Sequence, residues 1–188
     1  MSTRLIPEWR FGLRLALAFL AWNLLSIPLM PVYAQLVVPF AGWGLETLGL
    51  HDAQVLFTDA YPYVKWHSYD PAKVREESVS FHLLSYNLVL YLSLLTVVRR
   101  VPSSHRAILL LSGLPVLFLF HGIDLLLVVE SKHLTWSQPQ HYAFWDESLW
   151  FVVIKFYHSF SVLALKQIFP LLLLWLQWQG LRRWGRFA

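Results

Sequence analysis

The feature that most constrains this chain is a series of long apolar runs, each with arginines near one end. A transmembrane helix needs about 20 apolar residues, because each residue adds about 1.5 Å and the hydrocarbon core is about 30 Å thick. Four windows meet this requirement: residues 11–33, 81–98, 108–129 and 149–176. The sequence therefore predicts an all-α integral membrane protein, a bundle of four transmembrane helices forming a single domain over residues 1–188.

The composition supports lipid as the solvent of these runs. Hydrophobic residues make up 57% of the 188 residues and charged residues 14%, and the mean hydropathy is +0.50. A water-soluble fold of this length exposes too much of its surface to hide such an apolar excess. The lipid bilayer is therefore the first partner that we expect.

The arginines orient the four predicted spans. Short cytoplasmic segments collect Lys and Arg, and the basic clusters here all fall on one side of a four-span arrangement: Arg4, Arg10, Arg14, Arg99, Arg100, Arg106, Arg182, Arg183 and Arg186. This pattern predicts that both termini are cytoplasmic. Short basic clusters at the ends of apolar runs are typical of membrane topology, so we expect no nucleic-acid partner.

Two segments are expected on the external side, residues 34–80 and 130–148. Residues 34–50 are apolar but interrupted by Pro39, Gly42 and Gly44, which favours a helix lying along the interface. The alternation from Gln54 to Tyr69, around a central Asp-Ala-Tyr-Pro sequence, predicts a small external β-hairpin. The segment 130–148 is interpreted as a solvated connection with aromatic anchors.

The end of the first window also resembles a signal-peptidase site. Val32-Tyr33-Ala34 has the small-residue pattern that precedes such a cut. The apolar stretch before it, however, is longer than the apolar core of a typical signal sequence. An uncleaved anchor is favoured, and cleavage after Ala34 stays an open alternative.

Polar residues inside the apolar windows are the best functional clues. An ionisable group at mid-membrane costs about 2.5 to 3.5 kcal/mol, so it usually faces a protein interior or a wet cavity. Counted from the external ends of the third and fourth windows, Asp124 and Lys155 lie at one depth, and His121 and His158 at another. We therefore predict an Asp124–Lys155 ion pair beside a His121/His158 pair. These four residues either join the helices or line an outward-facing polar pocket that is catalytic or binds a ligand.

Two functions follow from that cluster. His121 and His158 on adjacent helices are a possible pair of axial ligands for haem b, in a membrane redox subunit. Alternatively, His121, Asp124 and His158 are candidate acid–base residues of an enzyme acting on a lipid-linked or periplasmic substrate. The chain has no cysteine, no Gly-x-Ser-x-Gly or His-Glu-x-x-His motif and no phosphate-binding glycine loop, and no metal site is predicted.

The order of features resembles the exosortase and archaeosortase group, and most of all the small exosortase-associated membrane proteins. The resemblance is carried by the arginine-led first span, the strand-like external segment, Tyr-Asn-Leu-Val-Leu at residues 86–90, the arginine-rich turn and His158 in the last span. Exosortases transfer sorting signals with a membrane-embedded Cys, Arg and His.

His158 matches the place of the exosortase histidine. The cysteine is missing, and neither the second nor the third window carries an arginine in its outer half, so cysteine transpeptidase chemistry is excluded. The resemblance thus implies an accessory or degenerate member, noncatalytic, that lies in the cytoplasmic (inner) membrane of a bacterium and assists protein sorting at the external face. Its partner would be an exosortase-type membrane enzyme or the substrate of that enzyme.

Overall fold

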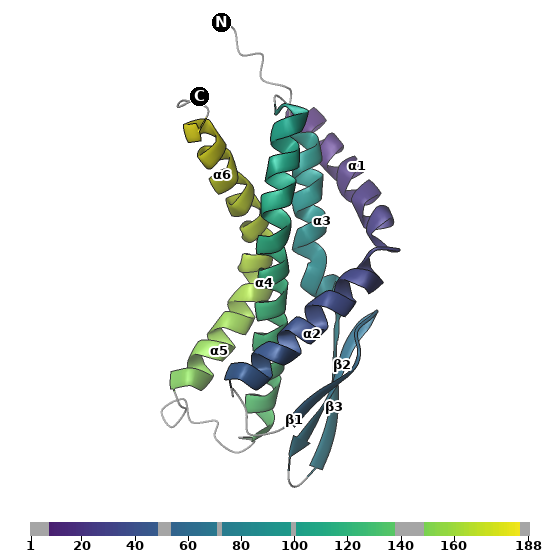
Figure 1. Ribbon diagram of the computed structural model, residues 1–188, viewed down its shortest axis with the longest axis vertical. Coiled ribbons are helices and arrows are strands. Elements are labelled where there is room, and N and C mark those ends of the chain that lie inside the picture. Colours follow the sequence, from purple (N-terminus) through teal and green to yellow (C-terminus); the bar gives the residue numbers. More distant parts are fainter. Residues whose placement is uncertain (1–7, 49–53, 71–72, 99–100, 138–148, 185–188) are drawn as a thin grey trace, which may run out of the picture.

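The computed structural model describes residues 8–48, 54–70, 73–98, 101–137 and 149–184. The chain is mostly helical, with a small three-stranded sheet at one end (Figure 1). The elements are α1 (Glu8–Ser26), α2 (Met30–Leu48), β1 (Gln54–Asp59), β2 (Tyr63–Asp70), β3 (Lys73–Ser80), α3 (Phe81–Val97), α4 (Ser103–Ser137), α5 (Leu149–Phe160), the π-helical turn η1 (Ser161–Leu165) and α6 (Lys166–Trp184).

The length and composition of the helices show fewer membrane spans than the sequence predicted. Among the described residues, only the helix at Ser103–Thr135 is by itself long and apolar enough to cross a membrane, and α1 and α2 qualify together as one bent pair. The predicted spans 81–98 and 149–176 do form helices. However, α3 has 17 residues, and the last predicted span is divided by a π turn after the 12 residues of α5.

The first predicted span, 11–33, is wrong as a single helix. It breaks between Ser26 and Met30, and α1 and α2 meet there at an angle of 76°. Pro28 explains the break, because proline has no N–H to donate and disfavours the helical conformation of the residue before it. Pro31 is tolerated because the first turn of a helix has unpaired N–H groups in any case.

The helix expected along the interface at 34–50 is α2, but it begins at Met30 and packs on α4. Gly44 of α2 allows the close approach, since a Cβ there would lie 2.8 Å from Leu126 Cδ1. On the other helix, a Cβ at Gly122 would overlap the ring of Phe40. The buried face of α2 consists of Met30, Ala34, Val37, Val38, Ala41 and Leu45.

The predicted β-hairpin is confirmed, and a third strand extends it. β1 pairs with β2 and β2 with β3, all antiparallel, and the Tyr61–Pro62 peptide bond in the turn is cis. The third strand was missed because residues 73–80 are mostly polar and lack an apolar alternation. Val64 and Trp66 of the central strand are fully buried, so the sheet is packed on the bundle.

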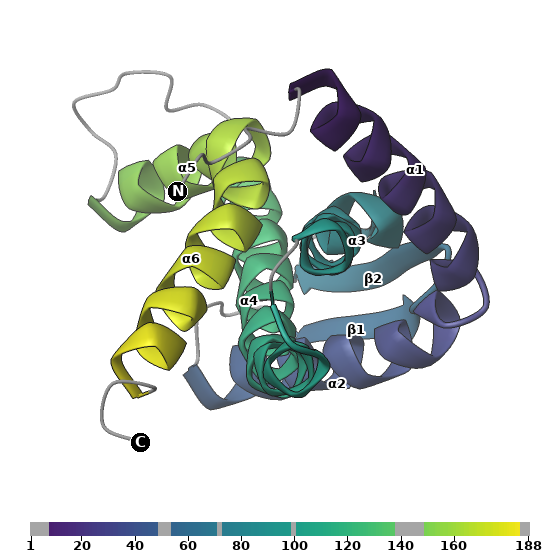
Figure 2. The ribbon, with the colours of Figure 1, turned by 90° about the horizontal axis from the view of Figure 1, so that it is seen from above.

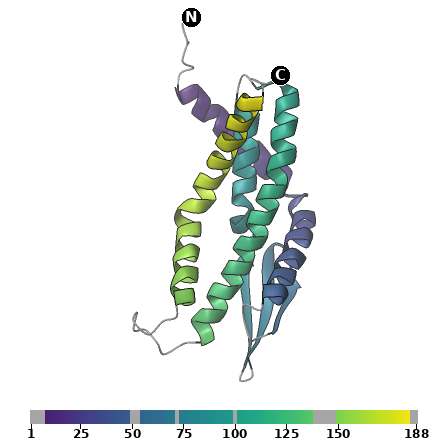
Figure 3. The same cartoon turned by 60° about the vertical axis from the view of Figure 1, so that its left-hand side comes forward.

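The helices run lengthwise between two ends of the molecule (Figure 1). The start of α1, the end of α3, the start of α4 and the end of α6 lie at one end, and the sheet lies at the other. Figure 3 shows α5, η1 and α6 as one continuous, bent helical column beside α4. The expected external connection 130–148 is partly helical, since α4 continues to Ser137, and residues 138–148 lie outside the described residues.

Candidate functional site

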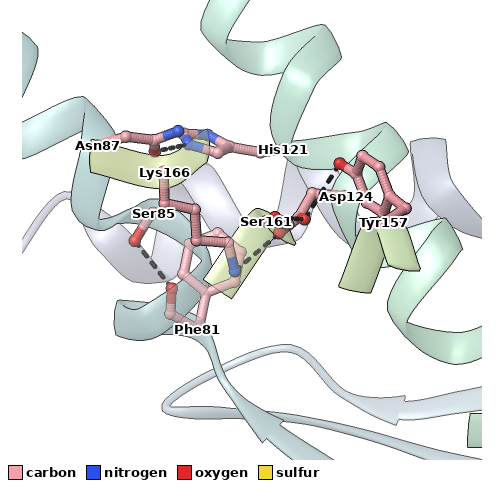
Figure 4. Close-up of polar contacts among 8 residues, drawn as sticks. All are labelled: Phe81, Ser85, Asn87, His121, Asp124, Tyr157, Ser161 and Lys166. Atoms are coloured by element: carbon pink, nitrogen blue, oxygen red, sulfur yellow. Dashed lines mark hydrogen bonds and ion pairs between the residues drawn. The ribbon is translucent and has the colours of Figure 1, made fainter. Parts of the chain in front are cut away.

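Two buried polar groups on α4 are the centre of the candidate site. His121 and Asp124 are both 0% exposed. They lie one helical turn apart, yet each belongs to a separate set of hydrogen bonds. We call these sets the His121 network and the Asp124 network (Figure 4).

The His121 network joins α4 to α2 and α3. The Tyr33 hydroxyl lies 2.7 Å from His121 Nδ1, and His121 Nε2 contacts Asn87 Oδ1. Because the Asn87 oxygen only accepts, Nε2 carries the proton, and Nδ1 accepts from the Tyr33 hydroxyl. This neutral tautomer satisfies both ring nitrogens, so the network is a chain of uncharged hydrogen bonds across three helices.

This arrangement bears on the proposed haem ligands. Both nitrogens of His121 are engaged by residues of α2 and α3, so neither is free to ligate a haem iron in this conformation. His121 therefore does not pair with His158 as the sequence predicted. Among the described residues, no group of three or more His, Asp or Glu side chains is placed to hold a metal ion.

The Asp124 network joins α4 to α5, η1 and α6. Asp124 Oδ1 accepts hydrogen bonds from Ser161 Oγ at 2.7 Å and from the Tyr157 hydroxyl at 3.3 Å. Asp124 Oδ2 lies 2.9 Å from Lys166 Nζ, and the Lys166 side chain is only 12% exposed. The carboxylate is thus neutralised by an ammonium and hydrogen-bonded on its other oxygen, as a buried charge requires.

The predicted Asp124–Lys155 pair is wrong, because α4 extends beyond the expected end at Val129. The extra length to Ser137 is about two helical turns. Asp124 therefore lies deeper than the count from Val129 suggested and meets Lys166. The ammonium of Lys155 hydrogen-bonds Thr135 Oγ1 near the C-terminal end of α4.

The π turn contributes to the Asp124 network. In a regular α-helix, residues five apart point to different sides, because one turn takes about 3.6 residues. A π turn has hydrogen bonds five residues apart and so brings such residues closer to one side. This local geometry lets both Ser161 and Lys166 reach the same carboxylate.

His158, the fourth predicted site residue, is half-buried on α5. Its Nδ1 is buried and has no hydrogen-bond partner among the residues that the structure describes. Ser161 donates its hydroxyl hydrogen bond to Asp124, and His121 is engaged elsewhere. The Ser161 hydroxyl is therefore donated to a carboxylate and not to a histidine base of the kind that activates a serine nucleophile.

A second buried acid lies toward the sheet. Glu130 is 0% exposed, and Trp150 Nε1 donates to its Oε1 at 3.3 Å. Nearby on α4, Lys132 lies 3.6 Å from Glu77 of β3, which ties the helix to the sheet. The interpretation of residues 130–148 as a solvated connection is wrong for Glu130, because α4 continues to Ser137.

The sequence analysis did not identify most partners of the two networks. The spacing of Lys166 places it on one helical face with Lys155 and His158, but the depth count did not pair it with Asp124. Ser161 reaches the same carboxylate at the π turn, which no sequence pattern predicts. Asn87 is a polar residue within a predicted span, and a polar residue in that position is the sequence signal that could have identified it as a partner. The partners missed are Tyr33, Asn87, Tyr157, Ser161 and Lys166.

No family model, curated protein or solved structure matches this chain.

Proposed function

We propose that this chain is a noncatalytic, four-pass protein of a bacterial inner membrane, with both termini cytoplasmic. In this proposal it holds a small sheet at the external face and assists an exosortase-type enzyme in protein sorting or processing. The observation that carries the proposal is that His121 and Asp124, the two buried groups at the centre of the networks, are both engaged by partners on neighbouring helices, while the sheet is packed on the end of the bundle away from the basic end.

The outer surface of the bundle supports the membrane placement. Large apolar side chains point outward from the helices; Leu111 of α4 is 72% exposed and Phe156 of α5 is 70% exposed. Exposed apolar surface on this scale requires lipid or a partner. Outward-facing residues of this kind include Leu13, Leu17, Leu20, Leu24, Leu36, Leu119, Ile123, Val153, Ile168, Leu172 and Leu176.

The proposal requires four helical passages, although among the described helices only α4 and the bent pair α1–α2 are long and apolar enough by length and composition. They are the bent pair α1–α2, then α3, then α4, and finally the continuous column α5–η1–α6 (Figures 1 and 3). A broken helix within a membrane is tolerated where other helices cover the freed backbone groups, and α1 packs on α3 while α2 packs on α4. The basic end of the bundle carries Arg10, Arg14, Arg106 and Arg183, whereas the sheet end carries charges of both signs, among them Asp59, Lys65, Glu76, Glu77, Glu130 and Lys132.

Both polar networks fit a structural role. Hydrogen bonds between membrane helices contribute about 0.6 to 2 kcal/mol each, so such contacts fix helix positions. Gln177 of α6 makes a further link of this type, since its Nε2 donates to Ser112 Oγ of α4 at 2.7 Å.

The sheet is the element that supports an accessory role. β3 continues into α3 without a loop, and the Phe81 N–H donates to Pro62 O at 3.0 Å, so the sheet cannot swing away from the bundle. An edge strand offers unpaired N–H and C=O groups to an extended peptide. A protein sorting signal or a strand of the enzyme is the partner that we propose for this edge.

Photo-crosslinking in native membranes tests the accessory role. A photoreactive amino acid replaces Leu56 of β1, which is 54% exposed, and the matched control replaces the lipid-facing Leu119 of α4, which is 48% exposed. We expect the Leu56 position, and not Leu119, to capture a cysteine-bearing membrane transpeptidase or a protein with a sorting signal. Capture of respiratory subunits, or the same products from both positions, would contradict the proposal.

The absence of native cysteine allows a direct test of topology. Ser104→Cys, at the start of α4, is expected to react with a membrane-impermeant maleimide only after the cells are opened. Glu76→Cys on β3 is expected to react in intact cells. The reverse labelling pattern would invert the topology, and labelling of both in intact cells would rule out the four-pass arrangement.

A further inference from the structure

We propose that a groove on the α1–α2 side of the bundle binds one acyl chain of an acidic phospholipid, with the lipid phosphate at Arg106. The inference needs the membrane placement proposed above, but not the accessory role. The groove consists of two adjoining cavities, and we call it the lipid groove.

The deeper cavity lies at the break between α1 and α2. Its volume is about 500 Å³. A cavity of this size is typical of small-molecule sites. Its two polar lining groups are already engaged: Ser26 Oγ donates to Asn23 O at 2.7 Å, and the Tyr33 hydroxyl bonds His121. The remaining walls are apolar, from Trp22 to Phe118, which suits a hydrocarbon chain rather than a polar ligand.

The second cavity extends the groove toward the basic end. It has a volume of about 210 Å³ and shares Trp22, Leu92 and Leu110 with the first cavity. Its other end is lined by Arg106. Seen from this end, α3 lies between α1 and α4 (Figure 2), and the shared residues come from these three helices.

Arg106 gives the groove a fixed positive end. Its guanidinium donates to Val98 O at 2.9 Å, to Val101 O at 3.2 Å and to Thr96 O at 3.4 Å. In the described part of the chain no carboxylate lies within ion-pair distance of it. Backbone carbonyls thus hold the guanidinium in place without neutralising it, and it keeps N–H donors for a phosphate.

The length of the groove matches the depth of one leaflet of the bilayer. From Arg106 to Phe118, α4 rises by about 18 Å. This distance is slightly more than half of the hydrocarbon core, which is about 30 Å thick. The groove therefore has a cation at one end and an apolar channel about as long as one leaflet is deep. These features are complementary to the anionic headgroup and to one acyl chain of a lipid in the cytoplasmic leaflet.

The test uses the full-length protein, delipidated in mild detergent and analysed by native mass spectrometry. It is titrated with phosphatidylglycerol and with phosphatidylcholine of identical acyl chains. We expect about a fivefold preference for phosphatidylglycerol, since one arginine near an anionic lipid surface contributes about 1 kcal/mol. Equal binding of the two lipids would overturn the proposal.

Three variants assign the binding to the groove. Arg106→Gln should remove the preference for the anionic lipid, and Arg106→Lys, which keeps the charge, should retain it even if the lost carbonyl contacts lower stability. Leu114→Trp, at the rim of the deeper cavity, should weaken binding of both lipids, whereas Leu119→Trp on the lipid-facing surface should not.

Two outcomes would show that something else fills the groove. Unchanged lipid binding in Leu114→Trp places the lipid elsewhere on the surface. If the protein forms dimers and Leu114→Trp disrupts them, the groove is occupied by a second copy of this chain. Either result overturns the inference and leaves the crosslinking test of the accessory role unaffected.

Discussion

The two sides of α4 differ in how they hold the neighbouring helices. Toward α2 and α3, His121 takes part in a chain of uncharged hydrogen bonds. Toward α5, η1 and α6, Asp124 forms a buried ion pair and accepts two hydroxyl hydrogen bonds. Because an orphaned charge is far more costly in an apolar medium than an orphaned neutral group, the α6 side should be the more sensitive to mutation.

The two sides of α4 also differ in whether close packing or polar contacts hold the neighbouring helix. On the α2 side, Gly122 lets the Phe40 ring lie against the α4 backbone, so the fit there depends on the absence of a side chain. On the α6 side, a π turn brings the polar groups together. The same helix is therefore joined to one neighbour by close backbone approach and to the other by charge.

The largest effect is expected for Lys166→Ala. The substitution leaves the Asp124 carboxylate buried without its cation, which costs about 3 to 5 kcal/mol. Thermal unfolding in detergent should show the greatest loss of stability of all variants. The double variant Asp124→Asn/Lys166→Gln, which removes both charges, should recover most of it.

Lys132→Ala is the matched control for that ion pair. The Lys132–Glu77 pair is partly exposed, with its charged atoms 3.6 Å apart. Such pairs contribute about 0 to 1 kcal/mol. If Lys166→Ala were no more destabilising than Lys132→Ala, the contrast between the two sides of α4 would be lost.

A smaller loss is expected for His121→Phe. The ring shape is roughly kept, but the hydrogen bonds to the Tyr33 hydroxyl and the Asn87 amide are lost, at about 1 to 2 kcal/mol each and so about 2 to 4 kcal/mol together. His82→Phe is the control, because His82 bonds Tyr61 at the exposed end of α3 and should change stability little. A loss of sorting activity at unchanged protein level would instead favour a catalytic His121.

Gly122→Ala tests the close packing on the α2 side. The new Cβ would overlap the Phe40 ring. Overpacking of this kind costs about 1 to 3 kcal/mol. For Gly12→Ala on α1, the new Cβ meets nothing within 4 Å, so there the better helix propensity of alanine should be neutral or stabilising. Equal melting temperatures of the two variants would show that α2 does not need this contact.

The smallest effect is expected for Tyr157→Phe. The Tyr157 hydroxyl lies 3.3 Å from Asp124 Oδ1. An average hydrogen bond between membrane helices contributes about 0.6 kcal/mol. Ser161→Ala, which removes the 2.7 Å bond to the same oxygen, should cost more. Measured melting temperatures in the opposite order would mean that the tyrosine, and not the π turn, positions the carboxylate.

The sequence could predict the helical segments and the hairpin because both depend on local patterns. Apolar runs of sufficient length located the helices, and the alternation around Tyr61-Pro62 located β1 and β2. The same approach missed β3, whose residues are polar, and treated residues 11–33 as one helix despite Pro28.

The hydrogen-bond and ion-pair partners of His121 and Asp124 were the least predictable part of the candidate site. His121 and Asp124 were found, because ionisable residues inside an apolar run are conspicuous. Their partners depend on how far α4 extends past Val129 and on a π turn at residues 161–165, so the depths counted from the sequence paired Asp124 with the wrong lysine.

The sequence by itself determined that long apolar helices carry a few buried polar groups and that the basic residues gather at the ends of those helices. Both follow from the cost of placing polar atoms in an apolar solvent, which acts on each segment separately. The tertiary structure alone decided which groups meet, because that depends on the register between helices. A shift of about three turns along one helix exchanges Lys155 for Lys166 as the partner of Asp124 without changing any local pattern.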